Sequence, residues 1–243
     1  MNPQSEIVNA LRKEILSLQG FRVPTENQQP DMELGLIENA FPNKIFPTAA
    51  VHEFISHGPE PMAATTGFMT ALLHKLLRKG GSCLWISPKE ILYPPALGSF
   101  GINPEKVFFI ETPKTKDILW TMEEALQCDT LTAVIGEIRE LDFNQSRRLQ
   151  LAVEHSKVTG FIHRVNPRHV GTVACVSRWL IRPLVSQTPK QMPGVGSPSW
   201  NIDLVKVRNG IPGNWQIEWY DGQFKHIPKH QTAERDIELK KTG

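Results

Sequence analysis

No apolar run in the 243-residue sequence approaches the ~18 residues that a membrane-spanning helix needs. The amino-terminal residues show no basic-then-apolar pattern of a secretory signal. The three cysteines, Cys83, Cys128 and Cys175, lie far apart and form neither a CxxC pair nor a metal-ligand spacing. We therefore expect a cytoplasmic protein with reduced thiols, no membrane contact, no bound metal and no cofactor.

The sequence also lacks a large excess of either sign of charge, because the formal net charge is only +2. So mild a balance does not demand a nucleic-acid partner. Hydrophobic residues make up 40% of the chain, which is enough for a core in one large α/β domain. The composition thus favours an ordinary globular protein.

The stretch from 49 to 77 reads as a buried strand, a glycine-bearing loop and a helix. This order is typical of a P-loop, in which backbone N–H groups and a helix N-terminus hold phosphate. In the pattern G-x-x-x-x-G-K-[ST], Gly58 stands at the first glycine and Thr65 at the hydroxyl position. Glu60 and Thr66 complete the segment, so the shape of a P-loop is predicted.

The groups that make such a loop reactive are missing. Ala63 replaces the second glycine and Ala64 replaces the lysine that would contact the β- and γ-phosphates. Pro61 removes an amide that could face a phosphate. We therefore expect a strand–turn–helix corner without nucleotide chemistry, in which Thr65 and Thr66 start the helix.

The rest of the chain predicts an α/β fold. Apolar runs that suit strands buried on both faces alternate with segments of helical spacing. Strands are predicted at 49–55, 82–87, 107–110, 131–135 and 160–163, and helices at 65–78, 90–100, 115–128 and 144–155. Longer strands at 171–185, 200–209, 215–219 and 224–227, with a turn at Asp221-Gly222, predict an antiparallel extension.

The ends of the chain differ from this core. Residues 1–19 have the apolar spacing of a helical arm, and residues 20–33 are polar and proline-containing, as in a linker. Residues 229–243 are charged and poor in large apolar side chains, which predicts a disordered tail. The main domain is expected over 34–228.

From about Ala49 to Gly222 the chain resembles the RecA ATPase core, which implies a three-layer sheet, mostly parallel, with an antiparallel C-terminal extension. Five further segments carry a closer resemblance: VHEF (51–54), LWTMEEAL (119–126), SRRLQLA (146–152), SRW (177–179) and WQIEW (215–219). In these segments the chain resembles the ImuA family, the RecA-like accessory proteins of bacterial mutagenic repair.

The RecA resemblance also locates the positions of lost catalytic groups. Lys89 stands where the catalytic glutamate is expected, with Glu90 next to it, and Gly136 stands at the Walker B carboxylate, with Glu137 next. Arg164 falls near the position of the γ-phosphate-sensing glutamine, and of the paired basic residues in the last turn only Arg208 is matched. Both DNA-binding loops of RecA look absent or short, so direct DNA binding is expected to be weak or absent.

The ImuA resemblance implies a non-catalytic interaction scaffold in SOS-induced, error-prone translesion DNA synthesis. It implies as partners an ImuB-type homologue of Y-family polymerases and an error-prone C-family DNA polymerase, with RecA as a further candidate. Residues that could contact DNA phosphates or an acidic partner are Arg147, Arg148, Arg164, Arg168 and Arg208.

Two other functions stay open. A division inhibitor of the SulA type has a related fold, and a divergent ATPase could work with a non-standard P-loop and Glu137 on Mg²⁺. His155 and His163 could suggest acid–base chemistry, but no serine or cysteine stands beside them in a recognisable motif. We therefore expect structural roles for both histidines.

Overall fold

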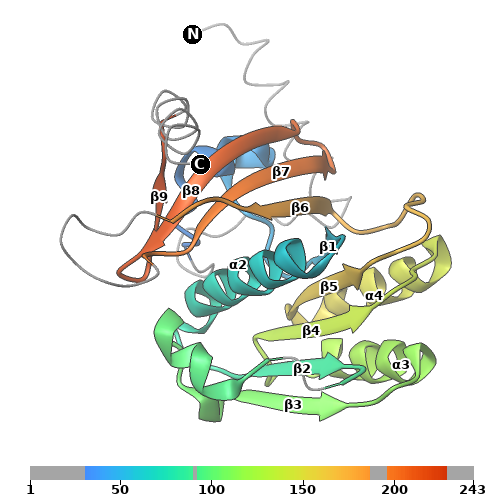
Figure 1. Cartoon of the computed structure of the whole chain (residues 1–243). Coiled ribbons are helices and arrows are strands. Elements are labelled where there is room, and N and C mark those ends of the chain that lie inside the picture. Colours follow the sequence, from blue (N-terminus) through green and yellow to red (C-terminus); the bar gives the residue numbers. More distant parts are fainter. Residues whose placement is uncertain (1–30, 90–91, 187–195, 229–243) are drawn as a thin grey trace, which may run out of the picture. The chain divides into compact units, whose positions relative to one another are not determined.

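The computed structural model describes residues 31–89, 92–186 and 196–228, and its strands form one nine-stranded sheet (Figure 1). The strand order is β3-β2-β4-β5-β1-β6-β7-β8-β9. The strands span Val51–Ser56 (β1), Cys83–Ser87 (β2), Val107–Glu111 (β3), Ala133–Ile138 (β4), Thr159–Val165 (β5), Ser177–Pro183 (β6), Ser199–Val207 (β7), Gly213–Tyr220 (β8) and Gln223–His226 (β9).

Strands β3, β2, β4, β5, β1 and β6 pair in parallel, and β6 to β9 pair antiparallel. The mostly parallel sheet with an antiparallel C-terminal extension is therefore confirmed. At the last hairpin, Asp221 and Gly222 have φ of 51° and 69°. Two successive positive φ values make the type I′ turn that an Asp-Gly pair predicts.

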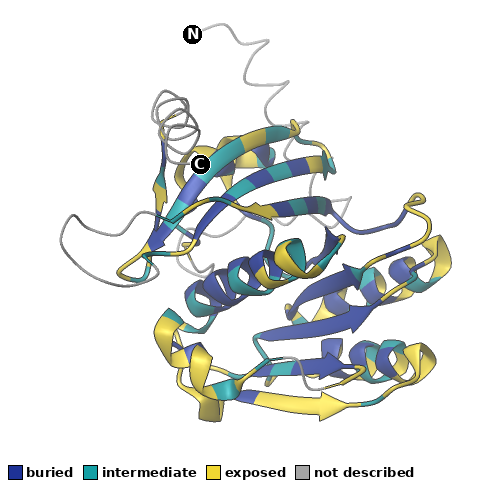
Figure 2. Ribbon diagram, in the orientation of Figure 1, coloured by how far each residue is buried: buried dark blue, intermediate teal, exposed yellow. Residues whose placement is uncertain are grey.

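Helices cover both faces of the sheet, which gives three layers (Figure 1). Helix α2, Pro59–Leu77, packs on one face, whereas α3, Thr115–Leu126, and α4, Phe143–Ser156, pack on the other. Two separate apolar clusters fill the spaces beneath them. The central strands β1, β4 and β5 are buried almost throughout (Figure 2), because helices shield them on both sides.

Trp179 on β6 is the centre of the larger cluster. Its fully buried ring stacks on Phe54 with centroids 5.9 Å apart, and Phe68 of α2 approaches it at 5.8 Å. Phe41 and Phe46 cover its other side at 5.9 and 6.3 Å. These two phenylalanines lie beside the short 3₁₀ helices η1, Gly35–Ala40, and η2, Pro42–Lys44, so the segment before β1 belongs to the same core.

Several predicted boundaries were wrong. Helix α2 begins at Pro59, six residues before the predicted start, so Thr65 and Thr66 lie inside it. Residues 171–176 precede β6 and are not part of a strand, and the helix predicted at 90–100 is a 3₁₀ helix, η3, over Pro94–Phe100. A further 3₁₀ helix, η4 (Pro104–Lys106), leads into β3. The predicted arm at 1–19 and tail at 229–243, and most of the linker at 20–33, lie outside the described residues.

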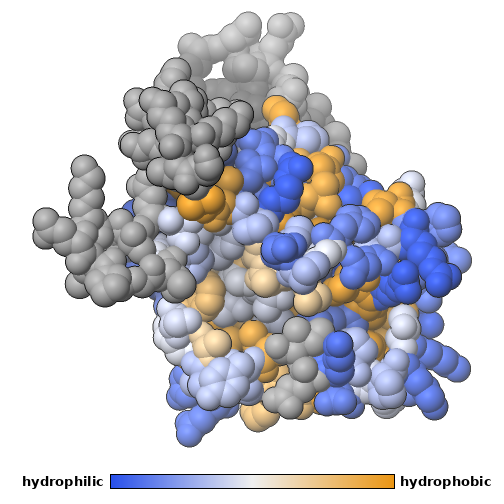
Figure 3. Space-filling view, viewed as in Figure 1, coloured by the Kyte–Doolittle hydropathy of each residue, from blue (hydrophilic) through white to orange (hydrophobic). Residues whose placement is uncertain are grey.

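Among the described residues, none of the helices combines the length and the apolar character needed to span a bilayer. On the face seen in Figure 3, exposed apolar residues form several separate groups among hydrophilic ones.

Substitution of Trp179 by alanine is predicted to lower the free energy of unfolding by about 3–5 kcal/mol, because the aromatic cluster would lose its central ring. Urea titration measures this change. Trp120→Ala is the matched control, since Trp120 on α3 is 62% exposed and its loss should cost less than about 0.5 kcal/mol. Equal losses in the two variants would contradict this description of the core.

Candidate functional site

The candidate site is the corner where β1 leads into α2. Strand β1 ends at Ser56, and only His57 and Gly58 separate it from the helix. Gly58 has φ of 85°, a value that side-chain-bearing residues adopt rarely. The Met62 amide already donates to the Gly58 carbonyl at 3.2 Å, as in a helix. The residues that a P-loop would wrap around a phosphate therefore form the first turns of α2, and the predicted P-loop shape was wrong at this point.

Few amides at this helix N-terminus are available to an anion. The Gly58 amide donates to Oδ1 of Asn166 at 2.8 Å, and Pro59 and Pro61 carry no amide hydrogen. Glu60 keeps its amide, but its exposed carboxylate lies in the same first turn. A carboxylate there interacts favourably with the helix dipole and disfavours a second anion.

The remaining residues of the P-loop pattern are part of helix α2. Thr65 is fully buried, and its hydroxyl donates to the Pro61 carbonyl at 2.7 Å. Ala64 is buried, whereas Ala63 is exposed. The carbonyl of Thr66 accepts from Thr70 at 2.8 Å. The hydroxyl that would bind Mg²⁺ in a P-loop thus serves the helix itself.

Glu137, the candidate Walker B carboxylate, lies in β4 on the face that α2 covers. It is buried, and its Oε1 accepts from Trp85 Nε1 at 2.8 Å. Burial raises the pKa of Glu137, and the hydrogen bond from Trp85 lowers it by less. Lys89 is exposed just after β2, and Glu90 lies outside the described residues. No cluster of three metal-ligating side chains occurs in the part of the chain that the structure describes.

A Ser–His pair lies beside Glu137 and was missed by the sequence reasoning. Ser56 Oγ lies 2.8 Å from His163 Nε2. In the register of β4 and β5, His163 lies directly opposite Glu137. Both residues of the pair are buried, and burial lowers the pKa of His163 to about 3. The His163 Nδ1 has no hydrogen-bond partner among the described residues. A serine without solvent access cannot act as a nucleophile on an external substrate, so the contact is structural.

A buried ion network joins the strands on either side of β1. Glu53 is fully buried and accepts from Arg164 of β5 at 2.8 Å and from Arg178 of β6. Arg164 also donates to the His169 carbonyl at 2.6 Å, and Arg178 donates to the Gly171 carbonyl at 2.6 Å. These bonds hold the loop after β5 against the sheet.

The network corrects the prediction for Arg164. This residue cannot be a surface contact, because its guanidinium is buried against Glu53. The other candidate arginines are accessible to different degrees. Arg147, Arg148 and Arg168 are exposed, and Arg208 is half-buried and donates to the Ala174 carbonyl. Arg148 also pairs with Glu123 of α3 at 2.6 Å, so it joins the two helices as well.

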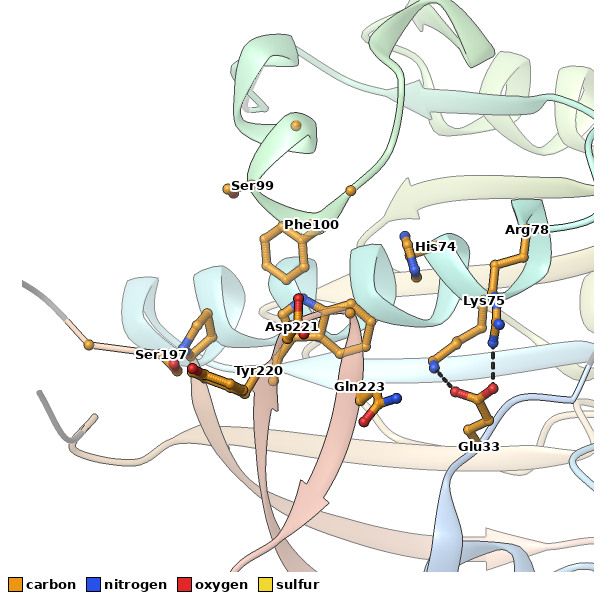
Figure 4. Close-up of a pocket in the computed structure, with 16 residues that line it drawn as sticks. Glu33, His74, Lys75, Arg78, Ser99, Phe100, Ser197, Tyr220, Asp221 and Gln223 are labelled. Carbon is orange, nitrogen blue, oxygen red and sulfur yellow. Dashed lines mark hydrogen bonds and ion pairs between the residues drawn. The ribbon is translucent and has the colours of Figure 1, made fainter. Parts of the chain in front are cut away.

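The pocket in Figure 4 lies at the other end of α2 from the candidate site. It encloses about 730 Å³ between the last turns of α2, η3 and the β8–β9 hairpin. Glu33 pairs there with Lys75 and Arg78, and the rings of Phe100 and Tyr220 line the wall. None of the residues of the P-loop pattern lines this pocket.

Comparison with known proteins now identifies the family. No protein-family model matches the chain. The chain is 30% identical over 241 residues to Protein ImuA of Caulobacter vibrioides strain NA1000 / CB15N, a match that covers 92% of this chain and 97% of that protein. The chain belongs to the ImuA family. The same similarity is found with Protein ImuA of Caulobacter vibrioides strain ATCC 19089.

A second, partial similarity is to division inhibitors. The chain is 27% identical over 128 residues to the cell division inhibitor SulA of Yersinia pestis strain Pestoides F. This match covers 52% of the chain and 75% of that SulA. Nearly half of this ImuA-family chain therefore has no counterpart in the SulA match.

Substitution of Glu53 by glutamine is predicted to lower the free energy of unfolding by about 3–5 kcal/mol, because two arginines would lose their buried counter-charge. Urea titration at neutral pH measures this change. Glu60→Gln, which changes an exposed carboxylate in the first turn of α2, should alter stability by less than about 1 kcal/mol. A Glu53 variant as stable as the Glu60 variant would contradict the ion network.

The two buried histidines predict a loss of stability in acid. Burial lowers the pKa of His163 to about 3 and that of His52 to about 4, against an ordinary value of 6.5. Their contributions are complete above pH 6.5 and are lost as the pH falls through the folded values, by about 2 kcal/mol each between pH 7 and 5. Glu137 acts in the opposite sense, since its raised pKa favours the folded state below pH 4.5.

Urea titrations at several pH values measure how the free energy of unfolding falls between pH 7 and 5. His163→Gln should reduce this fall by about half. An unchanged fall in His163→Gln would show that His163 is not held neutral in the folded protein.

Proposed function

We propose that this ImuA-family chain is a non-catalytic accessory protein of SOS-induced, error-prone translesion DNA synthesis. Family membership supports the accessory role in mutagenesis. The single observation that carries the non-catalytic part is the start of α2 at Pro59, which leaves no loop between β1 and the helix to enclose a phosphate. The protein would work by binding other proteins, with no reaction of its own.

Three further contacts support the absence of nucleotide turnover. The Gly58 amide donates to the side chain of Asn166, and the Thr65 hydroxyl donates to the Pro61 carbonyl. The indole N–H of Trp85 donates to one oxygen of Glu137. Phosphoryl transfer needs a cation, a metal-binding hydroxyl and free amides around the phosphates. The Gly58 amide, the Thr65 hydroxyl and one oxygen of Glu137 are thus bonded within the protein, and Ala64 supplies no cation.

The proposed partners are an ImuB-type homologue of Y-family polymerases and an error-prone C-family DNA polymerase, with RecA as a further candidate. The exposed arginines of α4, Arg147 and Arg148, could meet acidic groups of a protein partner. The net charge of +2 gives little long-range attraction for a polyanion. Direct contact with DNA is therefore proposed to be weak.

The alternative function is division inhibition of the SulA type, which the partial similarity favours. It makes a different prediction, because a division inhibitor would bind the tubulin-like division protein and block septation. Overexpression in the host should then give filamentous cells. The proposed accessory function predicts normal division in undamaged cells.

Mg-ATP is predicted to leave the melting temperature of the purified full chain unchanged within about 1 °C at millimolar concentration, because binding to the folded state would raise it. Differential scanning calorimetry measures the shift. The double variant Ala63→Gly/Ala64→Lys should not gain binding, since both positions lie in α2. A rise of several degrees in the wild-type chain would contradict the non-catalytic proposal and favour a divergent ATPase.

A pull-down of the tagged full chain from DNA-damaged host cells is predicted to recover the ImuB-type protein. A matched bait that lacks residues 1–19 tests the predicted docking role of that segment. Recovery of the division protein in place of any polymerase component would overturn the proposal in favour of the SulA alternative.

A further inference from the structure

The pocket in Figure 4, at the C-terminal end of α2, has the size and the chemistry of a ligand site. Its volume of about 730 Å³ lies within the range of roughly 300–1,000 Å³ that is usual for such sites. The rings of Phe100, Trp219 and Tyr220 line it together with a few charged side chains. Aromatic walls supply contact area, and a small number of charged groups fixes the orientation of a ligand.

The walls of this pocket come from three elements that pack closely around His74 of α2. The His74 ring lies edge to face on Trp219 of β8, with centroids 5.4 Å apart. A Cβ atom added at Gly101, after η3, would lie 3.0 Å from the His74 ring, and one added at Gly222, in the β8–β9 turn, would lie 3.4 Å from it. The pocket is therefore preformed, which lowers the entropic cost of binding.

One end of the pocket carries the cations (Figure 4). Lys75 is only 1% exposed and pairs with Glu33, so its charge is already compensated. Arg78 also pairs with Glu33 through Nη1, but its side chain is 51% exposed, and its Nε and Nη2 have no partner among the described residues. Burial lowers the pKa of His74, so this ring is neutral at pH 7. Arg78 is therefore the group at this end that can still bind an anion.

The other end of the pocket is aromatic. Phe100 points from η3 towards the β8–β9 hairpin, and its ring centroid lies 6.1 Å from that of Trp219. Trp219 is 4% exposed and forms the base of the pocket, whereas Tyr220 is 50% exposed and stands at its opening. A planar side chain packs favourably against such rings. The carboxylate of Asp221 repels a second anion at the hairpin, so an anionic group of the ligand would lie at Arg78.

We propose that this pocket binds a linear segment of a partner protein in which an aromatic residue stands next to an acidic one. The aromatic ring packs against Phe100 and Tyr220, and the carboxylate accepts hydrogen bonds from Nε and Nη2 of Arg78. Arginine and carboxylate form such paired bonds because their planar groups match. This inference rests on the proposed scaffold function and deepens it, since it assigns a docking surface and the kind of segment that it takes.

The open side of the pocket favours a peptide over a small molecule. Arg78 and Tyr220 stand half exposed at this side, and Ser99 of η3 is exposed beside them. A small-molecule site usually buries about 70–90% of the surface of its ligand, which walls as open as these do not achieve. A peptide can place one ring and one carboxylate in the pocket and keep its main chain at the surface.

The experiment titrates the isotope-labelled full chain with the peptide acetyl-Gly-Glu-Phe-Glu-Gly-amide and follows binding by NMR. The indole N–H signal of Trp219, the Nε–H signal of Arg78 and the amide signal of Gly222 should shift. The matched peptide acetyl-Gly-Gln-Phe-Gln-Gly-amide has the same shape and no charge. It should bind about tenfold more weakly, because a hydrogen bond between two charged groups is lost.

Two variants of the chain locate the carboxylate. Arg78→Gln should weaken binding of the acidic peptide about tenfold and change that of the glutamine peptide less than about twofold, because both changes remove the same pairing. Lys79→Gln is the matched control, since Lys79 is the next residue, is exposed and does not line the pocket. Its affinity for the acidic peptide should stay within about twofold of the wild type.

Several results would overturn this inference. They are the absence of shifts at millimolar peptide, shifts confined to residues outside the pocket, and an equal loss of both peptides in Arg78→Gln. Binding of N-acetylphenylalanine as tight as that of the acidic peptide would show that the site takes a small aromatic acid. The titrations use the purified chain, so their outcome does not depend on the scaffold function. If Arg78→Gln still recovers the ImuB-type protein in the pull-down, the scaffold function stands and this pocket is not its docking site.

Discussion

The carboxylate of Glu53 is the constraint on which most of this structure depends. It lies in β1, the middle strand of the nine-stranded sheet, and it is fully buried. A buried charge is tolerated only when it is paired and hydrogen-bonded. Arg164 and Arg178 meet that requirement from the strands on either side. The pairing therefore favours one register for β5, β1 and β6.

The same two arginines extend this constraint to the loop after β5. Their remaining donors bind the carbonyls of His169 and Gly171, so the loop is held against the sheet. Arg139 donates to the Asn166 carbonyl at 3.0 Å, and the side chain of Asn166 in turn holds the Gly58 amide. Arg164 Nε also donates to the Arg139 carbonyl at 3.4 Å, so a continuous set of hydrogen bonds runs from the centre of the sheet to the corner between β1 and α2. The corner is closed by groups of the protein itself, which is why we interpret it as structural.

The general fold could be predicted from the sequence, since buried parallel strands and the Asp-Gly hairpin leave local patterns. The start of α2 was harder to predict. Pro59, Glu60 and Pro61 resemble a loop, but proline is favoured in the first turn of a helix, where its missing amide costs nothing. The burial of Arg164 was missed for a different reason. Strand β5 continues to Val165, and an arginine inside an apolar run is the signal that could have indicated an ion pair with Glu53.

The contacts of the candidate site depend on pairing between distant segments, which local patterns do not specify. Ser56 meets His163, and Gly58 meets Asn166, only because β1 and β5 are neighbours in this strand order. The exposure of β3 has the same origin. Its run of apolar residues predicts a buried strand, and only its place at the edge of the sheet leaves those side chains accessible.

The most direct test of the central claim is the damage-induced mutation frequency of the host, with the chromosomal gene replaced by the double variant Thr65→Val/Glu137→Gln. This variant removes the hydroxyl and the carboxylate that a magnesium nucleotide would need, and it keeps their shapes. Our account predicts that deletion of the gene lowers the mutation frequency and that the variant restores it to the wild-type level. A folded variant that behaves like the deletion would contradict the account, as would a deletion without effect.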